Sequence, residues 1–331
     1  MRQIYGDVRT RIFLSASPIF LSAALFSIAS FVGAGWAAPQ SAQQRTFATP
    51  EAAVEALIGA ARGNDVGALE AVLGPGSRAV IDSGDPVEDK STRDEFLADY
   101  DMKSNLVAVN DTTRVLQVGP TDWPLPIPLV KQGAAWHFDL AAGRDEIINR
   151  RIGQNELNAI EAAQAFVDAQ QDYASEDRDG DKILEYAQRF ISAPGMKDGL
   201  YWPAQAGEEE SPLGPLFAEA RAEGYRPDTA APGSPFYGYR YKILTSQGQA
   251  AMGGAYDYIV NGNMLAGVGM IAYPAEYGIS GIMSFIVNHD GVVYQKDMGP
   301  ETASVAGTVT AFNPDDTWQR VEIPTAVATG P

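Results

Sequence analysis

Apolar and polar positions change their period along the chain, from helical spacing to strict alternation, which predicts helices followed by a sheet. The first helix begins behind Thr49, a good N-cap, with Pro50 suited to the first helical turn. A second helix over 66–73 is short, and a polar loop with a third helix occupies 76–101. Alternating strands are then expected at 106–110, 113–119 and 127–143.

A long helix over 145–175 follows, with Asn155 as an internal cap after Gly153. The next segment is irregular and rich in glycine, proline and acid, and it includes the run GEEESPLGP. Beyond it the pattern returns to strands, which are expected at 237–245, 255–260, 264–273, 281–288 and 292–297. The pattern therefore predicts an α+β protein in which one long helix joins two regions of antiparallel sheet.

Two connections in the second half have the sequence of tight hairpin turns, whose two central residues both need positive φ. They are Asn261-Gly262 and Asp290-Gly291. The second turn also carries His289 beside an aspartate, so a catalytic His-Asp pair is the alternative interpretation. Apolar alternation on both sides favours the hairpin, with His289 at its tip and without a catalytic role.

The N-terminus has the order of a secretory signal, with Arg2, Arg9 and Arg11 before an apolar run over 12–37. Cleavage after Ala37 would place small residues at the required positions. The run is also long enough to remain as a membrane anchor. We expect a cleaved signal and a periplasmic or secreted protein, with membrane contact only if the segment is kept.

The expected boundaries follow from these features. They are a signal peptide 1–37, a linker 38–45, an N-terminal α+β domain 46–143, a C-terminal helix-and-sheet domain 144–320 and a tail 321–331. Helices before a curved antiparallel sheet resemble the cone-shaped, cystatin-like fold of nuclear-transport-factor-2-like (NTF2-like) domains. Such domains are as often binding modules as enzymes.

Composition removes several classes of function. The formal net charge of −18 argues against binding nucleic acid or anionic lipid through a basic surface. The chain has no cysteine, which excludes disulfides, thiol nucleophiles and thiolate metal sites. Two isolated histidines cannot build an HExxH site, and no serine-hydrolase or phosphate-loop motif is present. Residues 267–272 match the glycine pattern of a dinucleotide-binding motif. No helix is expected to begin there, so we interpret the segment as a strand.

Asp177, Asp179 and Asp181 form the strongest chemical signal, because oxygen atoms at alternate positions of a turning loop can converge on Ca²⁺. Lys182 stands where an EF-hand loop needs glycine, so at most weak calcium binding is expected. The alternative is a solvated turn whose aspartates cap a helix beginning near Lys182. No other cofactor is expected.

Acids beside aromatic rings suit sugars, and a pair of carboxylates could hydrolyse a glycan. The candidate ligand-binding residues of this kind are Asp122, Trp123, Asp198, Tyr201, Trp202, Tyr273, Glu276 and Tyr277. No residue is assigned a catalytic role.

Several sequence segments are distinctive when they occur together. They include FATPEAAVEALI, DWPLPIPLVKQG, DYASEDRDGDKILEYAQRF and YPAEYGISGIMSFIVNHDGVVYQKDMG. They resemble the bacterial exported family catalogued as domain of unknown function 2950 (DUF2950). The resemblance covers nearly the whole chain after the signal, and it implies a secreted or periplasmic protein without an established activity.

The C-terminal half also resembles, more loosely, the globular heads of type IV pilin-like proteins, in which one long helix packs across an antiparallel sheet. The helix containing AIEAAQAFVDAQQDYASED and the later hairpin carry this resemblance. The helix is internal here, so pilus assembly is not implied. We therefore expect a non-enzymatic binding or assembly module of the cell envelope, with an unknown protein or polysaccharide partner. The alternative is a glycan-directed hydrolase that uses acids beside surface aromatics.

Overall fold

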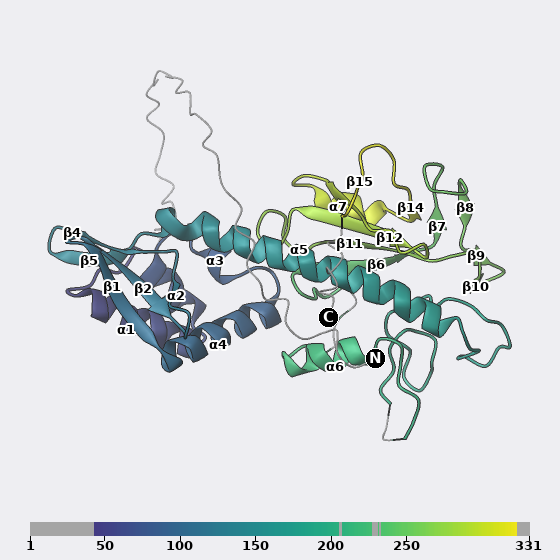
Figure 1. Ribbon diagram of the computed structural model, residues 1–331, viewed down its shortest axis with the longest axis horizontal. Coiled ribbons are helices and arrows are strands. Elements are labelled where there is room, and N and C mark those ends of the chain that lie inside the picture. The colour runs from purple at the N-terminus through teal and green to yellow at the C-terminus, as the bar shows by residue number, and fades with distance from the viewer. Residues whose placement is uncertain (1–42, 205–206, 227–230, 232, 323–331) are drawn as a thin grey trace, which may run out of the picture. The chain divides into compact units, whose positions relative to one another are not determined.

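The computed structural model describes residues 43–204, 207–226, 231 and 233–322, which form an α+β fold of helices and open, mainly antiparallel sheets (Figure 1). The predicted signal peptide and its cleavage site lie outside the described residues. Within the described part of the chain, no helix combines the length and the apolar character needed to cross a membrane.

Four helices precede the first sheet, and the polar residues in front of three of them determine where they start. Their bounds are α1 Pro50–Arg62, α2 Val66–Leu73, α3 Arg78–Ile81 and α4 Pro86–Met102. The side chains of Thr49, Asp65 and Asp85 accept backbone N–H groups of α1, α2 and α4. The predicted α1 and α2 are confirmed, whereas the predicted polar loop contains the additional short helix α3.

The first sheet is antiparallel and has the order β1-β2-β4-β5, with β3 paired to β2. Its strands are β1 Ser104–Asn110, β2 Thr113–Val118, β3 Trp123–Pro124, β4 Leu129–Gln132 and β5 Ala135–Phe138. Leu116, Leu129 and Phe138 are buried against α1 residues such as Leu57. Burial of this apolar surface is the main force that holds the helices on the sheet.

Helix α5, Leu140–Tyr173, is a single element of 34 residues. The sequence interpretation was wrong at its start, because Asp139 is the N-cap and residues 140–143 are helical rather than part of a strand. It was also wrong about Asn155. That residue is not an internal cap but a buried side chain whose amide donates to Ser280 O at 3.1 Å and to Glu88 Oε2 at 3.3 Å.

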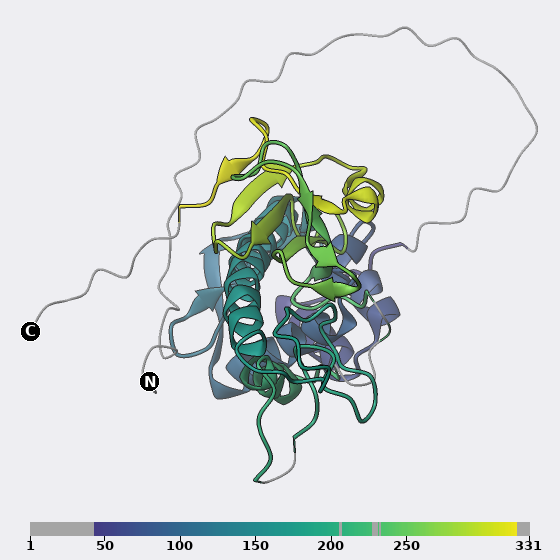
Figure 2. The same ribbon diagram turned by 90° about the vertical axis from the view of Figure 1, so that its right-hand side faces the viewer.

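The second large sheet is antiparallel, with the order β15-β13-β12-β11-β6. Its strands are β6 Tyr239–Leu244, β11 Gly269–Pro274, β12 Met283–Asn288, β13 Tyr294–Asp297 and β15 Gln319–Arg320. Helix α5 packs across one face, where Phe166 and Val167 meet Met270 and Phe285 (Figure 2). The other face carries a smaller cluster and helix α7, Thr302–Thr308.

Short elements complete the fold. They are β7 Ser246–Gln247, β8 Tyr256–Asp257, β9 Ile259–Val260, β10 Asn263–Met264, β14 Ala311–Phe312 and α6 Gly214–Ala222. Strands β7 and β14 pair in parallel, unlike the other pairs described. Helix α6 lies in the segment that the sequence interpretation treated as irregular, so that expectation was wrong for these nine residues.

Both predicted hairpins are confirmed, because β9 pairs with β10 and β12 with β13 in antiparallel fashion, but the position of the second turn was predicted wrongly. Asn261 and Gly262 both have positive φ, 55° and 97°, between β9 and β10. At the second turn only Gly291 has positive φ, and its N–H donates to Asn288 O at 2.9 Å. The turn therefore centres on His289 and Asp290, one residue earlier than predicted. The His289 ring packs edge-on against Tyr258, with centroids 5.9 Å apart, rather than standing free at a loop tip.

The predicted domain boundary at 143/144 falls inside α5. At the N-terminal end, the predicted linker already touches the fold, because Gln44 Nε2 donates to Phe138 O at 2.7 Å. At the other end, Val321 N donates to Val293 O at 2.9 Å. Separate folding of 46–143 and 144–320 stays a prediction.

Candidate functional site

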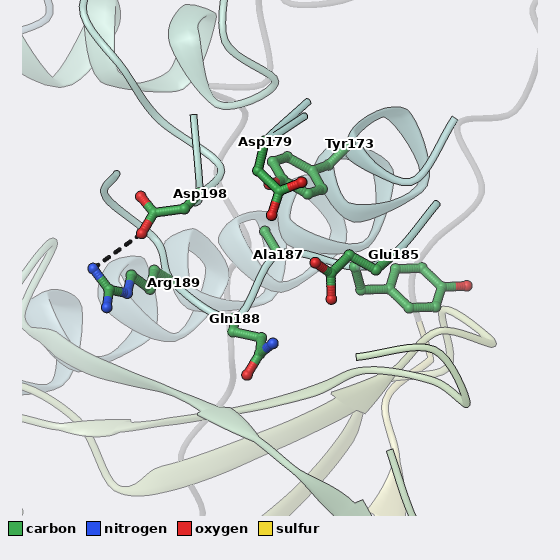
Figure 3. Close-up of a pocket in the computed structure, with 8 residues that line it drawn as sticks. Tyr173, Asp179, Glu185, Ala187, Gln188, Arg189 and Asp198 are labelled. Atoms are coloured by element: carbon green, nitrogen blue, oxygen red, sulfur yellow. Dashed lines mark ion pairs between the residues drawn. The ribbon is translucent and has the colours of Figure 1, made fainter. Parts of the chain in front are cut away.

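A small pocket lies beyond the C-terminal end of α5 and is lined mainly by polar side chains (Figure 3). Its volume is about 190 Å³. The lining residues are Tyr173, Asp179, Glu185, Tyr186, Ala187, Gln188, Arg189 and Asp198. Asp179 and Asp198, which the sequence analysis assigned to two different candidate sites, thus line the same pocket. We call it the carboxylate pocket.

The rear of the carboxylate pocket is fixed by α5. Tyr173 is 3% exposed, and its hydroxyl donates to Lys197 O at 2.8 Å. Burial, followed by the charges of Asp179, Glu185 and Asp198, raises the pKa of Tyr173 far above its usual value, so its hydroxyl stays a neutral donor. One turn earlier, the buried Gln170 amide pairs with both the N–H and the C=O of Ala187 at 2.8 Å. These contacts hold the segment that contains Glu185 against the helix.

Two of the carboxylates that line the pocket, Asp198 and Glu185, accept hydrogen bonds from backbone N–H groups. Asp198 accepts from Ala193 N at 2.8 Å and forms an ion pair with Arg189 at 3.1 Å (Figure 3). Glu185 accepts from Met264 N at 2.8 Å, and burial raises its pKa. A group of three acids and one arginine is suited to a cation or an amine rather than to an anion.

The loop of Asp177, Asp179 and Asp181 borders this pocket. One carboxylate oxygen from each lies within 4.8 Å of the others, and all three residues are exposed. Asp177 accepts from Gly180 N and Lys182 N at 2.8 and 3.0 Å. The predicted helix beginning near Lys182 was wrong, because the described chain is irregular there and Lys182 has φ of 72°. The aspartates cap turns of their own loop instead.

Arg178, between the first two aspartates, anchors this loop. Its side chain is 5% exposed, and it forms ion pairs with Glu209 and Asp172. It also donates to Tyr173 O at 3.3 Å and lies 5.8 Å from the centre of the Trp202 ring. The loop is thus tied to the end of α5 by the one basic side chain that interrupts its acids.

A second, larger pocket shares Gln188 and Arg189 with the carboxylate pocket. Its volume is about 730 Å³, and α5, α6 and β6 form its walls. Phe166, Leu216, Phe217, Phe236, Ile243 and Met270 give it an apolar surface. We call it the apolar pocket. This pocket was not predicted from the sequence, because α6, which supplies Leu216 and Phe217, was not expected.

A buried acidic cluster at the start of α4 was missed as well. Asp85 is 1% exposed and accepts from Tyr225 Oη at 2.9 Å and from Gly238 N at 3.1 Å. Burial, followed by the charge of Asp85, raises the pKa of Glu88 to about 7. Burial also raises the pKa of Asp89 and lowers that of Arg151. In the sequence, Asp85-Pro86 indicates a helix start. It gives no indication of the hydrogen-bond partners of Asp85, Tyr225 and Gly238, which lie 140 and 153 residues away.

Residues 44–321 match the model of the family described as protein of unknown function (DUF2950). The chain belongs to the DUF2950 family. The match includes both large sheets, α5 and both pockets. Comparison of this DUF2950 chain with curated proteins and with solved structures finds no match. The pilin-head and cystatin-like resemblances therefore stay predictions.

The remaining candidates for ligand binding in the DUF2950 chain lie apart from these pockets or within the core. Asp122 forms an ion pair with Lys103 at 2.7 Å, and Trp123 lies under Arg150 at 5.4 Å. Tyr201 and Trp202 are 4% and 5% exposed, because they pack in the core on the α5 side of the sheet. Their rings present almost no surface to a ligand.

The third candidate group surrounds the turn after β11. Tyr273 packs against the cluster on the far face of the sheet. The Glu276 backbone N–H donates to Ser280 Oγ at 3.0 Å, which closes the turn. Tyr277 Oη donates to Asp297 at 3.0 Å, and this bond raises the pKa of the tyrosine. Neither pocket includes these side chains among its described lining residues.

Weak calcium binding at the aspartate loop stays a prediction, and calorimetry checks it. We expect a Kd of roughly 10⁻⁴–10⁻³ M, because the loop offers three exposed carboxylates but lacks the EF-hand glycine. Asp179→Ala should abolish the heat of binding. Asp111→Ala, a change at an exposed aspartate in another turn, should leave it unchanged. Micromolar binding, or no heat at millimolar Ca²⁺, would contradict the prediction.

Proposed function

We propose that this DUF2950 protein is an exported, non-enzymatic binding module of the cell envelope, and that the apolar pocket is its ligand site. The pocket is the observation that carries the proposal. Its volume of about 730 Å³ lies within the range of small-molecule sites, which are mostly apolar with a few polar groups. Gln188 and Arg189 are such groups.

The construction of the pocket supports a binding role. Three separate parts of the fold converge on it, and Tyr201, in the neighbouring core, packs edge-on against Phe217 of α6 with centroids 4.5 Å apart. Aromatic contacts of this kind hold the wall in place before a ligand arrives. A preformed wall lowers the entropy lost on binding.

Export rests on the N-terminal segment 1–37, with its arginines, apolar run and small residues. We expect the protein to be recovered outside the cytoplasm with Ala38 at its N-terminus. A glycan-directed hydrolase was the alternative, and two of its proposed acids, Asp122 and Asp198, are held in ion pairs. Those pairs favour the binding role.

The experiment uses the exported protein, first checked by N-terminal sequencing, and the uncharged apolar dye Nile red. We expect the fluorescence of Nile red to rise on binding. Ala162→Phe, which places a ring into the pocket from α5, should weaken binding about tenfold or more. Ala142→Phe, at an exposed alanine of the same helix, is the matched control and should change nothing.

The same protein is incubated with peptidoglycan and polysaccharide fragments, and products are followed by chromatography. We expect no turnover. Turnover that one Asp or Glu substitution abolishes would overturn the non-enzymatic role. Equal dye binding by the native protein and Ala162→Phe would remove the pocket as the site.

A further inference from the structure

The first sheet has two edge strands, β1 and β5, which differ in how their free sides are covered. Beside β5, Phe47 exchanges two backbone hydrogen bonds with Trp136, at 2.7 and 2.8 Å. Strand β1, by contrast, pairs with β2 alone among the described strands. An edge strand of seven residues offers its free N–H and C=O groups to a further strand.

The register of β1 against β2 shows which backbone groups are open. Gly119 N donates to Lys103 O at 2.9 Å, and the antiparallel pairing continues in step from there. Hydrogen-bonded residues alternate along such a ladder, so Ser104, Leu106 and Ala108 direct their backbone groups away from β2. Within the described part of the chain, these groups have no hydrogen-bond partner. A β-bulge interrupts the register only after Ala108, so the open stretch is regular.

The side chains of β1 do not protect this edge. Ser104–Asn110 contains no charged residue and no proline, the residues with which proteins commonly block an edge strand. In residues 43–140, all of which the structure describes, the exposed large apolar side chains are Met102 and Val109, with 69% and 61% of their surface accessible. Met102 ends α4 just before β1, and Val109 lies near the end of β1. A strand that pairs with β1 therefore also lies beside both apolar side chains.

We propose that the edge of β1 is a dimer interface, where β1 of a second copy of this chain pairs antiparallel about a twofold axis at Leu106. Ser104 then faces Ala108 of the second copy, and the two Leu106 residues face each other. Each of these pairs exchanges two hydrogen bonds, so every open residue of both strands is paired. The same register brings Met102 of one copy close to Val109 of the other.

The charge of the chain favours a second copy at this edge over other faces. A chain with a formal net charge of −18 repels a second copy, and an uncharged strand allows contact with the least repulsion. The contact is a strand pair with few side chains, smaller than the roughly 1,200–2,000 Å² of a stable interface, so the dimer is reversible. Neither pocket includes β1 among its described lining residues, so this inference does not depend on the proposed function.

Sedimentation velocity over a range of concentrations measures the dimer of the exported protein. Ala108→Pro removes an edge N–H and no hydrogen bond to β2. It should raise the dissociation constant about tenfold or more, because the twofold axis repeats the loss in both copies. Val109→Lys should also weaken the dimer, since lysine blocks edge strands. Val260→Lys, at an exposed valine of β9, is the matched control and should change nothing. Circular dichroism and thermal unfolding confirm that each variant is folded.

Cysteine cross-linking tests the register, since the native chain contains no cysteine. In the proposed pairing Asn105 faces Val107 of the second copy at a non-hydrogen-bonded position, where Cα atoms are about 4.5 Å apart. A mixture of Asn105→Cys and Val107→Cys should therefore form a disulfide-linked dimer on mild oxidation. Either variant alone should not, because its two substituted positions would be diagonal neighbours about 7–8 Å apart.

Three results would overturn the inference. The first is a chain that stays monomeric at millimolar concentration. The second is a dimer that Ala108→Pro and Val109→Lys leave unchanged, or a cross-link no stronger in the mixture than in either variant alone. The third is a monomeric chain whose Leu106 and Ala108 amides exchange hydrogen more slowly when a peptide of alternating threonine and valine is added, which would assign the edge to a foreign strand.

Discussion

Gly143→Ala is expected to destabilise the protein by about 3 kcal/mol, whereas Gly153→Ala is expected to stabilise it by about 0.5–1 kcal/mol. Both glycines lie in α5. A Cβ at Gly143 would overlap the carbonyl of Pro126 and lie 2.6 Å from Ile127 N, so backbone would have to move. A Cβ at Gly153 would meet nothing within 4 Å, and alanine there only improves helix propensity.

Urea unfolding followed by circular dichroism measures both effects on one helix. Because the two substitutions are chemically identical, their difference reports the packing at residue 143 and not the propensity of alanine. If Gly143→Ala is as stable as the native protein, α5 does not approach the backbone of residues 126–127 as closely as the distances in this structure require.

Glu88→Gln is expected to raise the free energy of unfolding at pH 8 by roughly 2–3 kcal/mol and to have little effect at pH 4. Burial and Asp85 raise the pKa of Glu88 from 4.5 to about 7. Between these two values the folded state holds more protons than the unfolded state, so the native protein loses stability as pH rises from about 4.5 through about 7. Glutamine keeps an acceptor for the Asn155 amide and removes the charge.

Chemical denaturation from pH 4 to pH 8 checks this dependence. Glu95→Gln, at an exposed position of the same helix, is the control and should follow the native curve. Part of the slope should survive in Glu88→Gln, because burial also raises the pKa of Asp89. A Glu88→Gln curve parallel to the native one would show that Glu88 is ionised without penalty.

Features of the fold that depend on neighbours in sequence could be predicted. Thr49 and Asp139 illustrate the difference between strong and weak local signals. Thr49 precedes a proline and a clear apolar period, and its cap was expected. Asp139 follows an alternating strand directly, so the strand pattern concealed the start of α5 five residues before the predicted position.

Features that depend on partners far along the chain could not be predicted. Asn155 is polar in the middle of a helix, and only the fold brings Ser280 and Glu88 to its amide. The sequence suggested that Tyr201 and Trp202 are exposed rings beside an acid, but both side chains are buried in the core. Two residues of the carboxylate pocket, Asp179 and Asp198, were predicted as candidate site residues. The sequence did not indicate that they line the same pocket.

The two pockets share the lining residues Gln188 and Arg189. Arg189 is paired with Asp198 on the side of the carboxylate pocket. A ligand in the apolar pocket that drew Arg189 away from Asp198 would leave that carboxylate uncompensated and would raise the affinity of the carboxylate pocket for a cation. Linkage is reciprocal, so a cation held there would strengthen binding of that ligand by the same factor. A single arginine that lines two cavities would thus couple two ligands that never touch.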